Sequence, residues 1–342
     1  MTAVDVAAPA MRNLLLGALG RFKKSRYFQP VAVAAVMFIA LVLLPGFGGY
    51  WVRNFTTMAY LAVLAASAGM LYGRVGLVSL GQVAPFGIGT WVTMRLAFAT
   101  SLPYPILMLI GAVAATILGV LIGLPALRVS GLYLALVTLM LVAALEVVLG
   151  ELKFPNGGTG FRGLDPTLSK IIPMRRPSFA ESTIGYYRFC VIAAFLMFMV
   201  ASYILSRKPG RAWASIRQSE AAAISAGIDV TRYKIWAFAL ASFMAGVAGG
   251  LYAGLIPSGM DLSQFNRQSA IFVIAAAIMG GIYSLWGGIM AAFFMACLLK
   301  FLTQNVAPHQ FWESFNLSLF GFGLLMNLTQ SSKALDKKGL TG

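Results

Sequence analysis

The stretch "RKPGRAWASIRQSEAAAISAGIDVTRYKIWAFALASFMAGVAGGLYA", residues 207–253, changes character in its middle. Residues 207–234 carry eight charged side chains, whereas residues 235–253 carry none. A charged side chain at the centre of a bilayer helix costs about 2.5–3.5 kcal/mol, so the first part cannot cross a membrane. The second part belongs to an apolar segment, 233–255, that is long enough to cross one as a helix. The stretch therefore predicts a hydrophilic loop that leads into a membrane span.

Apolar segments of this kind recur along the whole chain. Of the 342 residues, 59% are hydrophobic and 11% are charged, whereas a soluble domain is roughly 25% charged. We therefore expect an all-α polytopic membrane protein with about ten transmembrane or re-entrant helical elements, some of them broken. Hydropathy places these elements at approximately 30–47, 54–73, 84–100, 104–124, 131–150, 187–206, 233–255, 268–282, 284–303 and 312–330.

The positive charges predict an orientation in the membrane. The formal net charge is +16, and short cytoplasmic loops collect Lys and Arg. With both termini in the cytoplasm, the 26 Lys and Arg residues divide as 16 inside and 10 outside, and six of the ten lie in one long loop that has little weight in this rule. The expected organisation is a basic cytoplasmic arm (1–29), a transmembrane domain (30–330) with an external loop (151–186) and a cytoplasmic loop (207–232), and a cytoplasmic tail (331–342).

Two stretches hold helix breakers inside otherwise apolar sequence. "GRVGLVSLGQVAPFGIG" (73–89) contains five glycines and Pro85, and "MGGIYSLWGG" (279–288) contains four glycines. Paired interruptions in the two halves of a transporter point to a substrate site near the bilayer midplane, because unwound backbone there can line a cavity. The alternative is that the glycines only allow close helix packing. The candidate pathway residues are Ser79, Gln82, Phe86, Glu146, Gly280, Gly281, Tyr283 and Ser284.

Glu146 belongs to this set for a separate reason. It lies about one turn before the end of the apolar segment 131–150, and an acid at membrane depth is a functional candidate. Its shallow position leaves contact with interfacial water as an equal alternative.

Other features favour packing rather than chemistry. Gly246, Gly250 and Gly254, spaced four apart, allow a neighbouring helix to approach closely. Cys190 and Cys297 fall inside apolar runs, as small packing residues do. No set of Cys, His, Asp and Glu has metal-ligand spacing, so the sequence nominates no metal site and no catalytic residue.

The charged loop contains a helix signal of its own. Residues 211–227 are rich in alanine, Pro209 and Gly210 precede them and Gly227 ends them, which predicts one amphipathic helix. An acid on an apolar face suits neither lipid nor water, so we expect a protein partner with a hydrophobic cleft and a basic group. Without that partner, Arg217 is expected to pair with Glu220, a contact worth only about 0.2–0.5 kcal/mol. The apolar face contains Trp213, Ile216, Ala223, Ile224 and Gly227, with Glu220 in its middle.

Glu220-Ala221-Ala222, with Gly227 five residues further on, resembles the EAA loop of ABC importer permeases, the cytoplasmic helix that docks on the ATPase subunit. The surrounding stretch, 210–253, resembles the permease subunits of branched-chain amino acid importers, the LivM type. The resemblance runs in order from about residue 50 to about residue 300. Four further stretches carry it: "GLVSLGQVAPFGIGTW" (76–91), "GLPALRVSGLYLALVTL" (123–139), "NGGTGFRGL" (156–164) and "MGGIYSLWGGIMAA" (279–292).

The resemblance implies a permease of the bacterial inner membrane that moves a small amino-acid-like solute inward by alternating access. It implies three kinds of partner chain: a second homologous permease, two ATPase subunits that bind ATP and Mg, and an external substrate-binding protein. The chain has no G-x-x-x-x-G-K-[ST] motif, which agrees with ATP hydrolysis on another chain, and we expect no cofactor and no nucleic acid here. The implied ATPase-coupling residues are Trp213, Ile216, Arg217, Glu220, Ala221, Ala222 and Gly227.

Three positions depart from the family pattern and leave the cargo open. Gln82 stands where the family usually has His, Tyr283 where it usually has Gly, and the acid is Glu146 rather than a Glu near Ala143. Branched-chain amino acids are the expected cargo, and urea, amides, and aromatic or other carboxylates are the alternative within the family. The alternative of another class is a stand-alone secondary transporter or channel, for which broken helices would serve equally well.

Overall fold

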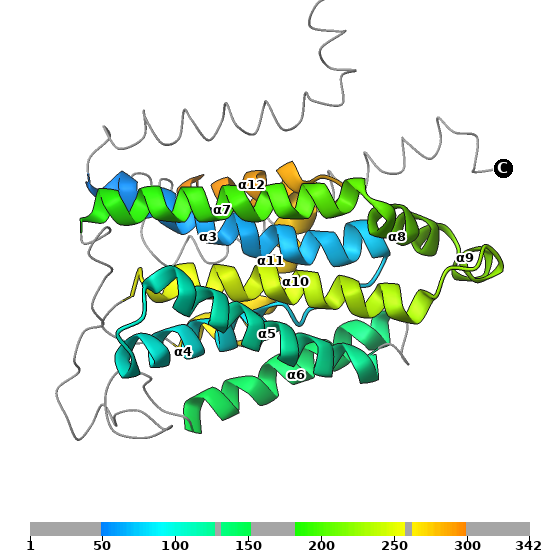
Figure 1. Ribbon diagram of the computed structural model, residues 1–342, viewed down its shortest axis with the longest axis horizontal. Helices are drawn as coiled ribbons and strands as arrows, with labels where there is room; N and C mark the ends of the chain where they lie inside the picture. Colours follow the sequence, from blue (N-terminus) through cyan, green and yellow to red (C-terminus); the bar gives the residue numbers. More distant parts are fainter. Residues whose placement is uncertain (1–48, 127–130, 152–181, 257–261, 299–342) are drawn as a thin grey trace, which may run out of the picture.

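Residues 49–126, 131–151, 182–256 and 262–298 are described by the computed structural model, and their regular structure is entirely helical. The longest helices lie side by side, and two short helices project at one end (Figure 1). In chain order the elements are α3 (Gly49–Met70) with its π-helical continuation η2 (Leu71–Val75), α4 (Val83–Ala99), α5 (Tyr104–Ala126), α6 (Leu132–Glu151), α7 (Thr183–Ser206), α8 (Lys208–Gln218), α9 (Glu220–Ser225), α10 (Val230–Ala253), η4 (Leu262–Phe265), α11 (Arg267–Gly280), α12 (Leu285–Phe293) and η5 (Phe294–Leu298).

The lengths and compositions of these helices fit a membrane protein. A helix needs about 20 apolar residues to cross a bilayer. α4 has 17 residues and α11 has 14, so each is shorter than a full crossing. Five helical stretches in the described residues are long and apolar enough: Gly49–Val75, Tyr104–Leu121, Tyr133–Glu151, Thr183–Ser206 and Val230–Ala253.

The prediction of an all-α polytopic membrane fold is confirmed. Eight of the ten predicted apolar elements coincide with helices, although α3 begins at Gly49 instead of 54 and α7 at Thr183 instead of 187. The other two elements, together with the predicted arm, tail and most of the external loop, lie outside the described residues: 30–47, 312–330, 1–29, 331–342 and 152–181.

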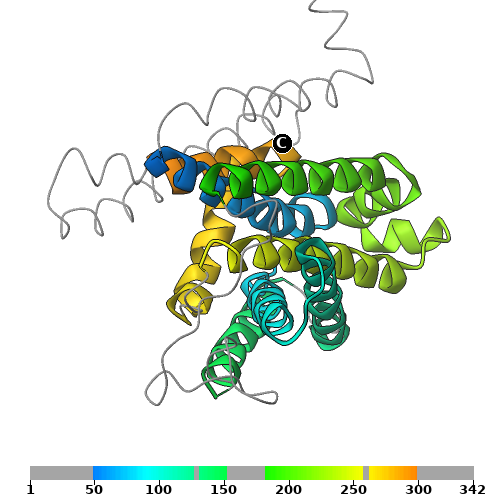
Figure 2. The same cartoon turned by 60° about the vertical axis from the view of Figure 1, so that its left-hand side comes forward.

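α10 is the helix around which the others pack. It lies against α5 and α4 on one side and α3 on the other, an arrangement visible in Figures 1 and 2. A methyl group on Gly246, Gly250 or Gly254 would overlap atoms of Ala112, Met108 or Tyr186, respectively. The hydroxyl of Tyr104 also donates to the carbonyl of Gly250 over 2.6 Å. The predicted packing role of these three glycines is confirmed.

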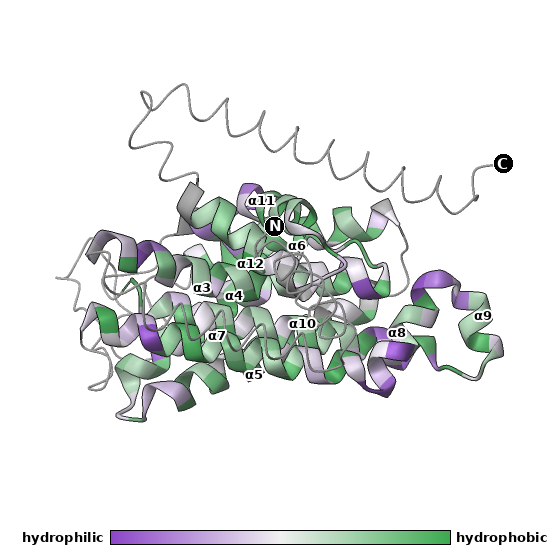
Figure 3. Ribbon diagram, turned by 90° about the horizontal axis from the view of Figure 1, so that it is seen from above, coloured by the Kyte–Doolittle hydropathy of each residue, from purple (hydrophilic) through white to green (hydrophobic). Residues whose placement is uncertain are grey.

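The outer surface of the helices is apolar, while the projecting end is polar. Figure 3 shows hydrophobic colour along the long helices and hydrophilic colour concentrated on α8 and α9. Side chains that are both large and hydrophobic are exposed along α5, α6 and α7, which suits contact with lipid or a neighbouring membrane protein. Examples are Leu109, Ile117, Leu121, Val137, Met140, Val147, Leu196 and Val200.

Candidate functional site

The first interruption separates η2 from α4. At Gly76 the backbone enters the left-handed region, with φ of 85°, and residues 76–80 form no helix. The chain then reverses, so that Gln82 lies beside Ser67, whose hydroxyl is 3.4 Å from Gln82 Oε1. Ser67 precedes the end of η2 by about 12 Å at the usual helical rise. α4 therefore begins inside the depth of α3, as expected of a broken membrane helix.

This interruption is partly buried and its backbone is hydrogen-bonded: Leu77, Ser79 and Gly81 are buried, whereas Gly76 is exposed. The amide of Leu80 donates to Thr138 Oγ1 on α6 over 3.0 Å, and the amide of Gly81 donates to Ser79 Oγ over 3.3 Å. Ser79 and Gln82 are themselves buried. Unpaired backbone groups in a membrane cost several kcal/mol each, and these side-chain contacts remove part of that cost. The segment is thus held in place by groups of its own chain.

One turn beyond Gln82, Phe86 lies in a cluster of four buried aromatic rings. Its ring centroid is 6.0 Å from that of Tyr60 on α3, 5.5 Å from Tyr252 on α10 and 5.3 Å from Phe265 on η4. These separations are in the range of favourable aromatic pairs. The cluster joins four elements, and Phe86 is packed rather than exposed to a channel in this conformation.

The second interruption lies between α11 and α12. α11 ends at Gly280, Gly281 takes φ of 99°, and the amide of Ser284 donates to the Gly281 carbonyl over 3.2 Å. Tyr283 is 51% exposed and Ser284 is also exposed. This turn therefore resembles the first interruption in glycine content but differs in being accessible from outside the chain.

The two interruptions meet at the end of α3. A methyl group on Gly73 would overlap the carbonyl oxygen of Ile282, and one on Gly69 would lie 3.8 Å from the same oxygen. The structure thus places Ser79, Gln82 and Phe86 on one side of this junction. It places Gly280, Gly281, Tyr283 and Ser284 on the other.

Glu146 lies apart from both interruptions. It is half-buried on α6, next to Leu145 and Leu149, which contact Gly87 of α4. Among the described residues it takes part in no hydrogen bond or ion pair, and no group of three or more His, Cys, Asp or Glu residues is placed to hold a metal ion.

The prediction of one continuous helix over 211–227 is wrong. The chain forms α8 and α9, and between them Ser219 adopts extended backbone, with φ of −162° and ψ of 121°. The Ser219 hydroxyl accepts a hydrogen bond from the Ala222 amide, and Glu220 occupies the first turn of α9. Serine is a preferred N-cap and an acid in the first turn interacts favourably with the helix dipole, so this pair starts a new helix.

α8 is packed against its own chain. Trp213 and Ile216 are buried, and Trp213 Nε1 donates to the Tyr233 carbonyl over 2.8 Å. The helix lies against α7, α10 and η2. Trp213 and Ile216, which were predicted to contact a partner protein, are therefore covered by other helices of the same chain. Helical periodicity indicates that a face is buried, but it does not show what covers that face.

α9 is the exposed member of the pair. Ile224 is 63% exposed, and Ala221, Ala222 and Gly227 are exposed as well, while only Ala223 is buried. Gly227 takes φ of 77°, and the amide of Ile228 donates to the Ala223 carbonyl over 3.0 Å, which closes the helix end in a Schellman motif. The predicted role of Gly227 as a helix stop is confirmed.

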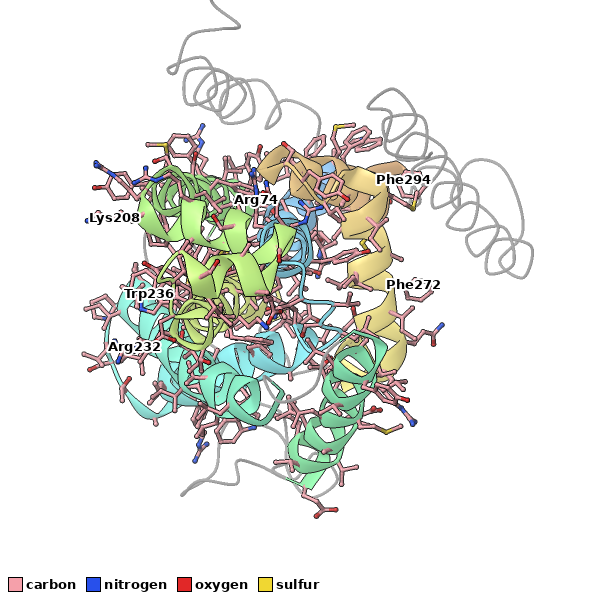
Figure 4. All side chains as sticks on the ribbon, turned by 90° about the vertical axis from the view of Figure 1, so that its right-hand side faces the viewer. Arg74, Lys208, Arg232, Trp236, Phe272 and Phe294 are labelled. Carbon is pink, nitrogen blue, oxygen red and sulfur yellow. The ribbon has the colours of Figure 1, made fainter. Side chains whose placement is uncertain are left out.

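Glu220 pairs with Lys234 and not with Arg217. Lys234 Nζ lies 2.6 Å from Glu220 Oε1, and the two side chains are 10% and 54% exposed. Because Glu220 is half in solvent, the pair contributes only about 0.2–1 kcal/mol. Arg217 points the other way, towards Gly73. Figure 4 looks onto this end of the molecule, where Arg74, Lys208 and Arg232 project from three different elements.

Thr138, Lys234 and Arg95 are not among the candidate residues predicted from the sequence. Thr138 is 58 positions from Leu80, and Lys234 is 14 positions from Glu220 on another helix, so no local spacing links either pair. Arg95, in contrast, is a buried arginine within the apolar helix α4. A charge at membrane depth is a functional candidate by default, and this signal is readable in the sequence.

Broken crossings in an all-helical membrane domain are typical of membrane transport proteins. The family model described as "Branched-chain amino acid transport system / permease component" matches residues 50–326. The chain belongs to this family of permease components.

Individual relatives agree on a permease but not on a cargo. The chain is 29% identical over 262 residues to the high-affinity branched-chain amino acid transport system permease protein LivM of Salmonella typhimurium, and 27% identical over 255 residues to LivM of Escherichia coli. Each match covers 69% of this chain, which spans 59% of the length of either relative. The ribose import permease protein RbsC of Haemophilus influenzae is 27% identical over 207 residues, 58% of each chain. No solved structure matches the chain.

Proposed function

We propose that this chain is the membrane-spanning permease subunit of an ATP-driven importer of the bacterial inner membrane. It carries a small amino-acid-like solute inward, and ATPase subunits dock on α9. The observation that carries the proposal is α9 itself: a helix capped at both ends, with its apolar Ile224 in solvent. A stand-alone transporter or channel has no use for a projecting helix of this kind.

The charge distribution supports a cytoplasmic location for the end that bears α9. Basic residues cluster there, and short cytoplasmic loops are enriched in Lys and Arg. An ATPase needs cytoplasmic ATP, so its docking helix has to lie on this side. The basic residues at this end are Arg74, Arg207, Lys208, Arg211, Arg217, Arg232 and Lys234.

The two interruptions supply the transport pathway in this proposal. α4 and α11 are both shorter than a full crossing, so each leaves irregular backbone at membrane depth. Such backbone is tolerated where it is buried in protein or lines a water-filled cavity. In the arrangement described, the rings around Phe86 are packed together, so this path is closed. Alternating access then requires these elements to separate in another state.

Branched-chain amino acids are the cargo favoured by the family and by the two LivM relatives. The match to a ribose import permease makes a sugar the competing cargo. The test is uptake of radiolabelled leucine, valine and ribose by vesicles that contain the chain with its partner subunits. ATP-dependent leucine or valine uptake supports the assignment, and ribose uptake alone overturns it.

The docking role is tested with Ile224→Asp. An exposed apolar residue that becomes an interface anchor typically contributes about 2 kcal/mol or more, so this variant should lose most ATPase co-purification and ATP-dependent uptake. Ala214→Asp is the matched control, because Ala214 is exposed on α8 and the same charge is added there. Normal ATPase retention by Ile224→Asp would refute docking at α9.

Glu220→Ala tests the charge contribution to the same contact. The substitution leaves Lys234 without its acid and removes the group offered to a basic residue of the ATPase. Truncating one member of a buried interfacial pair costs about 2–5 kcal/mol, whereas loss of the pair within the free chain costs less than about 1 kcal/mol. Glu220→Ala should therefore insert normally but bind the ATPase weakly. Equal loss of folded protein and of ATPase binding would assign Glu220 a purely structural role.

A further inference from the structure

The side chain of Arg217 links α8 to both interruptions. Its Nη1 donates a hydrogen bond to the Gly73 carbonyl over 2.7 Å. The guanidinium carbon lies 4.4 Å from the centroid of the Tyr283 ring, in a cation–π arrangement. One residue of a polar helix therefore contacts the end of η2, just before the first interruption, and the exposed tyrosine of the second.

These contacts fall at the point where the two interruptions touch. Gly73, whose carbonyl accepts the bond from Arg217, is also the residue packed against the Ile282 carbonyl. Gly76 faces the same side chain, since a Cβ placed on it would lie 3.3 Å from Arg217 Cγ. Displacement of Arg217 would therefore remove a neighbour from both segments at once.

Directed contacts, rather than attraction to an acid, position Arg217. Within the described residues it forms no ion pair, and Arg74 beside Gly73 is near enough to repel it. The last carbonyls of a helix lack an intrahelical donor, and Arg217 supplies one at Gly73. A guanidinium can donate this bond and also place its flat face over a ring, whereas a Lys ammonium has no flat face.

We propose that Arg217 is the positioning residue through which α8 holds the two interruptions together in the closed arrangement. When an ATPase moves α8, the guanidinium leaves Gly73 and Tyr283, and the exposed second interruption is released. This inference rests on the proposed function, because it takes the ATPase as the agent that moves α8. It assigns Tyr283 to the coupling of ATP hydrolysis with transport rather than to the choice of cargo.

The test measures solute transported per ATP hydrolysed in vesicles that contain the whole complex. Arg217→Ala should keep the ATPase bound and hydrolysing while this ratio falls by about tenfold, the size of a typical coupling between sites. Arg217→Lys should not restore the ratio, because an ammonium lacks the flat face. Tyr283→Phe should behave like the original chain and Tyr283→Leu like Arg217→Ala. The substrate concentration for half-maximal uptake should stay the same in all four variants.

Arg211→Ala is the matched control, because it removes an exposed arginine from the same helix. The double variant Arg217→Ala with Tyr283→Leu should be no worse than Arg217→Ala alone, since the contact that Tyr283→Leu removes is already absent in Arg217→Ala. If Arg217→Ala does not insert, Tyr283→Leu carries the test: labelling of a cysteine at Ser284 by a soluble thiol reagent should accelerate several-fold. An unchanged ratio with bound ATPase, or an unchanged labelling rate, overturns the role of Arg217. Failure of the proposed function is distinct, because Ile224→Asp would then retain the ATPase.

Discussion

The two interruptions have similar sequences but are held in place differently. In the first, Thr138 and Ser79 satisfy backbone amides, and Leu77, Ser79 and Gly81 are buried. In the second, the turn is closed by its own backbone, and Tyr283 extends to the surface under Arg217. Glycine content alone does not distinguish them. The first interruption is fixed by side chains of neighbouring helices, whereas the second packs on α3 and contacts α8 through Tyr283 and Arg217.

The largest effect is expected at the junction between the two. Gly73→Ala would place a methyl group on the carbonyl oxygen of Ile282, a backbone atom that cannot move aside cheaply. Overpacking costs about 1–3 kcal/mol and occasionally more, and a clash with backbone lies at the upper end of this range, so less folded protein should be recovered. Gly150→Ala is the control, because a methyl group there meets nothing within 4 Å. Size-exclusion chromatography and thermal unfolding in detergent provide the measurement, and equal recovery of both variants would contradict the close contact.

A smaller loss is expected from Thr138→Val, which tests whether the first interruption is fixed by its side-chain bonds. The Leu80 amide would lose its acceptor inside the protein. A buried donor left unsatisfied costs about 1–3 kcal/mol, and Thr138→Ser should restore most of this because it keeps the hydroxyl. Thermal unfolding of the three proteins measures the difference. If valine and serine behave alike, the hydroxyl does not support the segment.

The second interruption should respond to backbone strain alone. Gly281 has φ of 99°, and a methyl group on it would meet nothing within 4 Å. Gly281→Ala should therefore cost about 1–3 kcal/mol through its conformation, less than Gly73→Ala, and should lower transport more than insertion. Comparison of uptake with the amount of inserted protein separates the two effects. A loss of inserted protein as large as that of Gly73→Ala would place Gly281 in the packed core.

The smallest effect is expected from single cysteine substitutions, which compare the solvent accessibility of the two interruptions directly. Cysteines at Ser79 and at Ser284 replace one small polar side chain by another, although a thiol at residue 79 is only a weak acceptor for the Gly81 amide. Labelling is therefore compared only in folded protein recovered after size-exclusion chromatography. A membrane-impermeant thiol reagent added to inside-out vesicles should label the cysteine at Ser284, which is exposed, and not the one at Ser79, which is buried. Labelling of both at equal rates would remove the distinction between the interruptions.

Local signals in the sequence predicted most of the helices and their breaks. The contacts between helices could not be predicted, because they depend on residues far apart in the sequence. The helix breaks were predictable because Gly76 and Gly281 act within their own turns. Ser219 followed by Glu220 is an equally local cap signal, but the run of alanines favoured a continuous helix. The burial of Trp213 could not be predicted, because it depends on Tyr233 across a loop. The pairing of Glu220 with Lys234 could not be predicted either, because it depends on how α10 packs against α9.

The anchored tryptophan also sets the scale of motion that the coupling requires. Trp213 is fully buried and hydrogen-bonded, so it is a natural pivot for α8, and Arg217 lies four residues beyond it. At the helical rise this is a lever arm of about 6 Å, so tilting α8 by about 20° displaces the Arg217 backbone by about 2 Å. If this displacement adds to the 2.7 Å between Arg217 Nη1 and the Gly73 oxygen, the two atoms are too far apart for a hydrogen bond. In the proposed mechanism, a modest rotation at the ATPase contact is thus enough to break the link between α8 and the two interruptions.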